Sequence, residues 1–251
     1  MLNSQFCKIF DIPFFQFAQM KKYCPEDIPI IKAKYKENWE EWKALSLDVY
    51  RKLGMPFAEP HIERWCNGWQ VRAHFFTYYK YEFNQNSAVI LSVILNRRRL
   101  QVSLDWHCYR ADRSQVKLPQ YQQWWENLDL EKYNDFEIWQ GDESEYADFK
   151  KLKELDDLTL ENREAYWCIG KNVEREDLAK IDAAEFILNQ DDNSFKESKG
   201  FKDLQKENPD ITVDDAKQVL ANRAGEEAML RAFFSSATLG AAFSNAERKL
   251  F

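Results

Sequence analysis

Two runs of sequence decide the fold: QVRAHFFTYYKYEF at residues 70–83 and LQVSLDWHCY at residues 100–109. In both runs apolar side chains alternate with mostly polar ones, and a period of two predicts half-buried β-strands. The second face of these runs carries polar side chains, among them Arg72, His74, Tyr78, Lys80, Asp105 and His107. Pairing of the two strands would place these groups side by side.

The sequence around these runs completes the fold prediction. Residues 88–95 are apolar on both faces, as expected of a central strand, and residues 136–140 and 164–170 read as two more strands. Between Pro25 and Gly54, apolar residues recur every three or four positions, which predicts one long amphipathic helix. We therefore predict an α+β fold in which an antiparallel sheet of about five strands is covered by a long N-terminal helix.

Helical patterns dominate the second half of the chain. Asp142 and Glu145 resemble a capping box, which predicts a helix to about Leu155. From Glu174 onward the pattern is helical, with a polar link near Asp191 and a last helix over 226–243. The prediction divides the chain into an α+β domain at 1–190 and a helical extension at 191–251.

Composition excludes several classes of protein. Apolar residues make up 45% of the 251 residues, enough to form a core rather than a disordered chain. The seven glycines never form G-x-G-x-x-G, and Gly170-Lys171 lacks the remainder of a P-loop. The chain therefore has no nucleotide-binding signature of either kind.

The cysteines and the apolar segments bear on localisation. Five scattered cysteines without a C-x-x-C pair predict reduced thiols rather than disulfides or a zinc knuckle. The first residues lack a basic leader followed by a sustained apolar run, and no uncharged apolar stretch is long enough for a membrane span. We expect a soluble cytoplasmic protein.

Charge is distributed unevenly along the chain. Residues 1–117 carry a net charge of +6 and residues 118–251 one of −13, giving −7 overall. A general nucleic-acid binder is usually basic throughout, so any contact with a polyanion must be local. The simpler interpretation is that the two halves complement each other within the protein.

The predicted polar face suggests a candidate site with two kinds of residue. Its acid–base groups would be His74, His107 and Asp105, because histidine titrates near neutral pH and a carboxylate can orient it. Its anion-binding groups are listed together: Arg72, Tyr78, Lys80, Arg97, Arg98 and Arg99. The competing interpretation is a structural face whose polar groups satisfy one another. The spacing of histidines and cysteines matches no metal motif, and no cofactor is indicated.

Three functions follow from this pattern. The first is a module that binds an anionic small molecule, a nucleotide or a short nucleic acid through the polar face and through Arg97–Arg99, called the arginine turn below. The second is a phosphoester-processing enzyme that uses His74 and His107. The third is an interaction protein whose acidic helical C-terminus docks a protein partner or a second copy of the chain, without contact with a membrane.

Four segments resemble an uncharacterised bacterial family: CKIFDIPFF at 7–15, WQVRAHFF at 69–76, LNRRRL at 95–100 and LDWHCYR at 104–110. The resemblance spans about residues 1–190. Members of that family are sometimes labelled glucose-6-phosphate 1-dehydrogenase. Such a dehydrogenase needs a glycine-rich nucleotide turn that this chain cannot make, so neither the activity nor any catalytic residue carries over.

Overall fold

The computed structural model describes residues 2–53, 57–82, 85–122, 124, 131, 133–155, 166–188, 204–212, 215, 216 and 219. Its centre is an antiparallel sheet with the strand order β1-β2-β3-β4-β7-β5-β6. The strands are β1 (His61–Ile62), β2 (His74–Tyr79), β3 (Val89–Asn96), β4 (Arg99–Trp106), β5 (Glu137–Gln140), β6 (Lys150–Lys151) and β7 (Trp167–Glu174). The α+β prediction is confirmed. The sheet has more strands than expected because β1 and β6 are too short to show a period of two.

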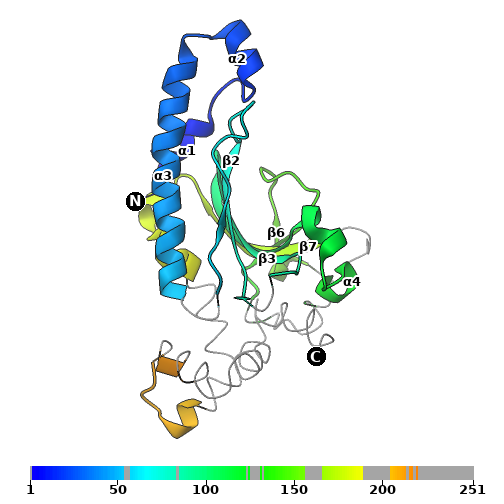
Figure 1. The fold of residues 1–251 in the computed structure, drawn as a ribbon. Coiled ribbons are helices and arrows are strands. Elements are labelled where there is room, and N and C mark those ends of the chain that lie inside the picture. The colour runs from blue at the N-terminus through cyan, green and yellow to red at the C-terminus, as the bar shows by residue number, and fades with distance from the viewer. Residues whose placement is uncertain are drawn as a thin grey trace.

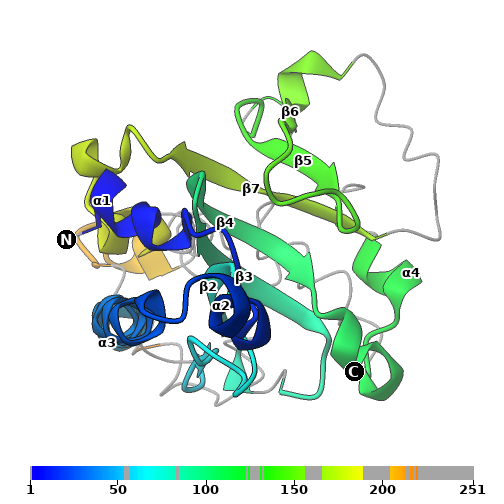
Figure 2. The same ribbon diagram turned by 90° about the horizontal axis from the view of Figure 1, so that it is seen from above.

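Helical segments flank this sheet. They are α1 (Ser4–Cys7), η1 (Lys8–Phe10), α2 (Phe17–Tyr23), α3 (Asp27–Leu53), η3 (Cys108–Arg113), α4 (Leu118–Tyr121), η5 (Leu152–Glu154) and η6 (Leu178–Lys180). The long helix α3 runs beside the strands (Figure 1), and α1 lies on the same side of them as α3 (Figure 2). Within the described residues, no helix is both long and apolar enough to cross a membrane.

The predicted long helix is confirmed, with its start at Asp27 rather than at Pro25. Pro29 is tolerated in the first turn because the first amides of a helix have no acceptor within it. The helix buries Tyr35, Trp42 and Val49 against the sheet. There the ring of Phe75 lies 6.2 Å from the rings of both Tyr35 and Trp42.

Hydrogen bonds fix α3 against β2 at both ends of the contact. The Tyr35 hydroxyl donates to the carbonyl oxygen of Arg72 at 3.0 Å. Farther along α3, the Ser46 and Thr77 hydroxyls lie 2.9 Å apart, and the Tyr79 hydroxyl donates to the Ser46 carbonyl at 3.0 Å. These bonds satisfy buried polar groups and so set the position of β2 on the helix.

Strand register separates the sheet into an apolar face and a polar face. His74 pairs with Asn96, and Ile90 pairs with Asp105. Because successive side chains point to opposite faces, Phe75, Val93 and Val102 face α3. The opposite side, called the polar face below, carries His74, Phe76, Tyr78, Ile90, Ser92, Ile94, Asn96, Arg99, Gln101, Ser103 and Asp105.

Two helix predictions are wrong. Residues 141–149 form turns and irregular backbone between β5 and β6, not a helix from Asp142. The helix expected from Glu174 is not continuous, because β7 extends to Glu174 and the described residues that follow form a 3-10 helix at Leu178–Lys180 and an α-helix only from 183 to 188. In both places long-range contacts outweigh local propensity. The predicted last helix at 226–243 and most of the predicted extension lie outside the described residues.

Candidate functional site

A pocket of about 300 Å³ opens on the polar face. It is lined by Glu63, Arg72, His74, Phe76, Ile90, Ile94, Asp105, Trp106, His107, Cys108, Tyr109 and Tyr166. Four of the residues predicted from sequence therefore meet in one pocket: Arg72, His74, Asp105 and His107. They come together because their alternation places them on one face of β2 and β4 or directly beside it.

One end of the pocket contains two ion pairs. Nδ1 of His74 lies 2.9 Å from Oε2 of Glu145, and Nη2 of Arg72 lies 2.5 Å from Oε1 of Glu63. Burial alone would lower the pKa of His74, but the hydrogen bond and charge of Glu145 outweigh it and raise that pKa. Burial alone would raise the pKa of Glu145, but His74 outweighs it and lowers that pKa. The imidazolium and carboxylate forms therefore stabilise each other.

Asp105 lines the pocket as a buried carboxyl group. Its Oδ1 accepts hydrogen bonds from the Cys168 thiol at 3.2 Å and from the Trp106 amide at 2.6 Å. Burial raises the pKa of Asp105 despite these donors, because an ion in a low-dielectric site loses its hydration. The sequence predicts that Asp105 orients a histidine, whereas in the structure its carboxyl group hydrogen-bonds with the Cys168 thiol, the Ser92 side chain and the Trp106 amide.

The other end of the pocket adjoins a group of basic side chains around Tyr78. The His61 ring stacks on Tyr78 at 4.9 Å, and the His107 ring approaches it edge-on at 5.4 Å. The Lys80 ammonium lies 5.7 Å and the Arg110 guanidinium 6.0 Å from the centre of the same ring. We call His61, Lys80, His107 and Arg110 the basic cluster.

The basic cluster affects its own protonation. Burial, followed by the positive charge of Arg110, lowers the pKa of His61. Burial likewise lowers the pKa of His107, and the charges of Arg110 and Lys80 add to the effect. Both imidazoles are therefore neutral at pH 7 and become cationic only in more acidic solution.

Lys80 is a buried member of this cluster. It is 4% exposed, and its ammonium group donates to the carbonyl oxygens of Ser87 and Gln85. Arg110, by contrast, is exposed and hydrogen-bonds with Tyr78. Lys80 can therefore supply positive potential, whereas Arg110 can also reach a ligand directly.

The three consecutive arginines lie outside the pocket. The Arg97 guanidinium stacks 4.4 Å from the centre of the Tyr146 ring. Arg98 pairs with Asp148 and, at 3.1 Å, with Glu174. Arg99 is only 1% exposed; it lies 3.8 Å from Glu174 and 3.9 Å from Glu137, and donates to the carbonyl of Ala147. The arginine turn thus binds acids and carbonyls of the chain itself.

Several residues that line or support the pocket are not predicted from the sequence. Glu145, which pairs with His74, reads as a helix start in the sequence. Cys168, which donates to Asp105, lies on a predicted strand that carries no chemical motif. Tyr166 packs on Gly141, where an added Cβ would lie 1.9 Å from the tyrosine ring carbons. Glycine at 141 is therefore required for this wall of the pocket. Tyr109 ends the second run, residues 100–109, and Arg110 follows it. In the sequence they resemble a core aromatic residue and a structural cation, and only their exposure in the structure shows that they are neither.

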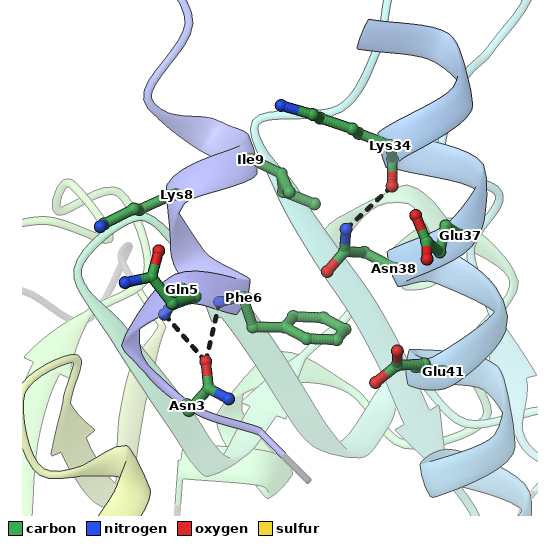
Figure 3. Close-up of a pocket in the computed structure, with 9 residues that line it drawn as sticks. All are labelled: Asn3, Gln5, Phe6, Lys8, Ile9, Lys34, Glu37, Asn38 and Glu41. Atoms are coloured by element: carbon green, nitrogen blue, oxygen red, sulfur yellow. Dashed lines mark hydrogen bonds between the residues drawn. The ribbon is translucent and has the colours of Figure 1, made fainter. Parts of the chain in front are cut away.

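A second hollow of about 470 Å³ lies between α1, η1 and α3. Figure 3 shows side chains of both charges around it, among them Lys8, Lys34 and Glu37. The Asn3 side chain caps α1 through the amides of Gln5 and Phe6. The described residues include no group of three or more His, Cys, Asp or Glu side chains suited to hold a metal ion. We place the candidate site on the polar face because Arg72, His74, Asp105 and His107 meet in its pocket.

The fold and pocket define an α+β protein with a polar sheet-face site, and comparison with known proteins places it further. A protein-family model matches residues 2–193, and the chain belongs to that family. An "Uncharacterized protein" of Haemophilus influenzae (strain ATCC 51907 / DSM 11121 / KW20 / Rd) is 60% identical over 188 residues. That match covers 74% of this chain and 91% of the relative.

Proposed function

We propose that the polar face binds a ligand that combines a planar ring with a phosphate, namely a nucleotide or a short nucleic acid. One observation carries the proposal: a pocket with an apolar floor opens directly beside the basic cluster around Tyr78. The two parts match the two halves of such a ligand. A dehydrogenase role is no part of the proposal, because the chain has no glycine-rich nucleotide turn.

The apolar half of the site would accept the ring. Phe76, Ile90 and Ile94 project from adjacent strands β2 and β3 and line the pocket. Aromatic and aliphatic walls with a few polar groups are usual in small-ligand sites. The volume of about 300 Å³ is at the lower end of the usual range for such sites, which suits a single base.

The basic half of the site would hold the phosphate. The Arg110 guanidinium offers a planar set of donors that matches phosphate oxygens. The buried Lys80 adds positive potential beside the Tyr78 ring, and His61 and His107 add further positive charge when protonated. The pairing of Arg98 and Arg99 with Glu174 excludes these two arginines from the proposed contact.

Arg110→Gln tests the phosphate half, with Arg113→Gln as a matched control on the same 3-10 helix. Both residues are exposed, so neither substitution threatens the core. In a calorimetric titration with thymidine monophosphate, we expect Arg110→Gln to bind about tenfold more weakly than wild type. This corresponds to a loss of roughly 1.4 kcal/mol of binding free energy. Equal affinities of the two variants would contradict the proposal.

A second candidate function is phosphoester processing. The observation that favours it is that two histidines in one pocket have pKa values shifted in opposite directions. Burial would lower the pKa of His74, but Glu145 outweighs burial and raises it, whereas burial lowers the pKa of His107. Such a divergence gives one group as acid and the other as base at the same pH. We expect hydrolysis of bis(p-nitrophenyl) phosphate to fall at least 100-fold in His107→Gln. No turnover by the wild type, or equal turnover by both proteins, excludes this function.

The setting that we propose for either function is the cytoplasm. All five cysteines are free thiols, and unpaired cysteines are usual where thiols are kept reduced. Binding to nucleotides or nucleic acid would also occur there.

A further inference from the structure

We infer that the ligand is single-stranded nucleic acid and that Tyr109 is a stacking platform for a second base, next to the base held in the pocket. This inference rests on the proposed function and adds a binding subsite to it. It is carried by the position, exposure and orientation of Tyr109 together with the charge beside it.

Tyr109 is the most exposed large hydrophobic side chain in the described part of the chain, at 94%. It also lines the pocket on the polar face. An isolated exposed aromatic on a surface needs no explanation, but this ring is exposed within the lining of a candidate site. A base of any identity can stack on such a ring, because every base has a π-face.

The separation of the two base positions favours a splayed strand. The proposed base in the pocket packs on Phe76, Ile90 and Ile94. Tyr109 is 94% exposed, and the His107 ring meets it edge-on at 6.0 Å. Bases on these two surfaces would not be stacked on each other. Splayed, unstacked bases are characteristic of recognised single strands, and a duplex cannot supply them.

The charge between the two base positions suits a phosphodiester. Arg110 follows Tyr109 directly, and its guanidinium lies 6.0 Å from the centre of the Tyr78 ring and hydrogen-bonds with the Tyr78 side chain. Lys80 and His107 approach the same ring from the sheet. The phosphate that links the two bases would thus lie on the basic cluster. Because the chain as a whole carries −7, we expect only one or two phosphates to be neutralised.

The experiment compares fluorescein-labelled thymidine monophosphate, the dinucleotide and the tetranucleotide in anisotropy titrations, with matched uridine ligands as a second arm. We expect the dinucleotide to bind wild type about tenfold more tightly than the mononucleotide, since stacking of one base contributes about 1–3 kcal/mol. Affinity should fall with salt at a logarithmic slope of about −0.7 per phosphate. A stronger uridine series would indicate RNA, and a stronger thymidine series DNA.

Tyr109→Ala should abolish the gain from the second nucleotide, so that the dinucleotide binds no more tightly than the mononucleotide. Tyr109→Phe should keep the gain, because it keeps the ring. Tyr23→Ala, which removes another exposed tyrosine at 59% on α2, should change nothing. A mononucleotide that binds as tightly as the tetranucleotide, or an equal loss for both ligands in Tyr109→Ala, overturns the inference and leaves the proposed function standing. If no ligand binds, the proposed function fails as well.

Discussion

Nδ1 of His74 lies 2.9 Å from Oε2 of Glu145, which joins strand β2 to the irregular segment 141–149 between β5 and β6. The Asn96 side-chain amide donates to the Glu145 carbonyl at 3.3 Å and adds a second link. Residues 146–148 then engage the arginine turn. The His74–Glu145 pair therefore forms one end of the pocket and also helps to hold the segment over the polar face.

Glu145→Gln should destabilise the protein most near pH 5–6. The raised pKa of His74, in which Glu145 outweighs burial, gives stability that is present below the unfolded pKa of about 6.5 and is lost as pH rises through the folded value. The lowered pKa of Glu145 gives stability that is lost as pH falls below about 4.5. Both side chains are partly exposed, so we expect a cost of about 1 kcal/mol, or 2–4 °C in Tm.

Thermal unfolding from pH 4 to pH 9 measures this dependence. The control is Glu40→Gln, which removes an exposed carboxylate on α3. A Tm difference for Glu145→Gln that is the same at pH 5.5 and pH 9 would refute the assigned role of the pair.

Arg99→Met should be among the most destabilising substitutions on the polar face. The guanidinium is 1% exposed, lies 3.8 Å from Glu174 and 3.9 Å from Glu137, and stacks at 4.8 Å over Phe149. Its removal takes the buried cation away from Glu137, while Glu174 keeps its pair with Arg98, and breaking a buried ion pair typically costs about 3–5 kcal/mol. Arg97→Met, at an exposed position over Tyr146, should cost less than about 1 kcal/mol. Urea unfolding measures both, and similar costs would count against the buried network.

Much of the sheet could be predicted from the sequence because its signals are local. The period of two in residues 74–79 and 99–106 identifies β2 and β4, and the three-to-four spacing before Leu53 identifies α3. The meeting of His74, Asp105 and His107 in one pocket also follows from shared alternation on strands of the same sheet.

The remaining features depend on residues far apart in the chain. Arg98 and Arg99 look like a solvated turn in sequence, since nothing nearby indicates that Asp148 and the Ala147 carbonyl will cover them. The capping pattern at Asp142 and Glu145 predicts a helix for the same reason. Glu145 instead contacts His74 and Asn96, and these tertiary contacts outweigh a short local motif.

Asp105→Asn should make stability less dependent on pH. Burial raises the pKa of Asp105 above its ordinary value. Such a group contributes stability below the unfolded pKa of about 3.9, and this stability is lost as pH rises through the folded pKa. We therefore expect Asp105→Asn to gain Tm relative to wild type as pH rises from 4 to 8. Cys168→Ser, which keeps a donor to the carboxyl group, serves as the comparison. A constant difference between wild type and Asp105→Asn would mean that Asp105 is ionised throughout.

Binding of a thymidine dinucleotide should strengthen as pH falls from 8 to 5.5. A phosphodiester keeps its charge over this range, so the dependence must come from the protein. Burial and Arg110 lower the pKa of both His61 and His107, and an adjacent phosphate favours their cationic forms. A gain of one pKa unit at one histidine corresponds to about 1.4 kcal/mol, or tenfold in affinity. The variant His61→Gln/His107→Gln should lose most of this gain, whereas Arg113→Gln should follow wild type. Anisotropy titrations at each pH measure the effect, and an affinity that is flat with pH in wild type would remove the two histidines from the phosphate contact.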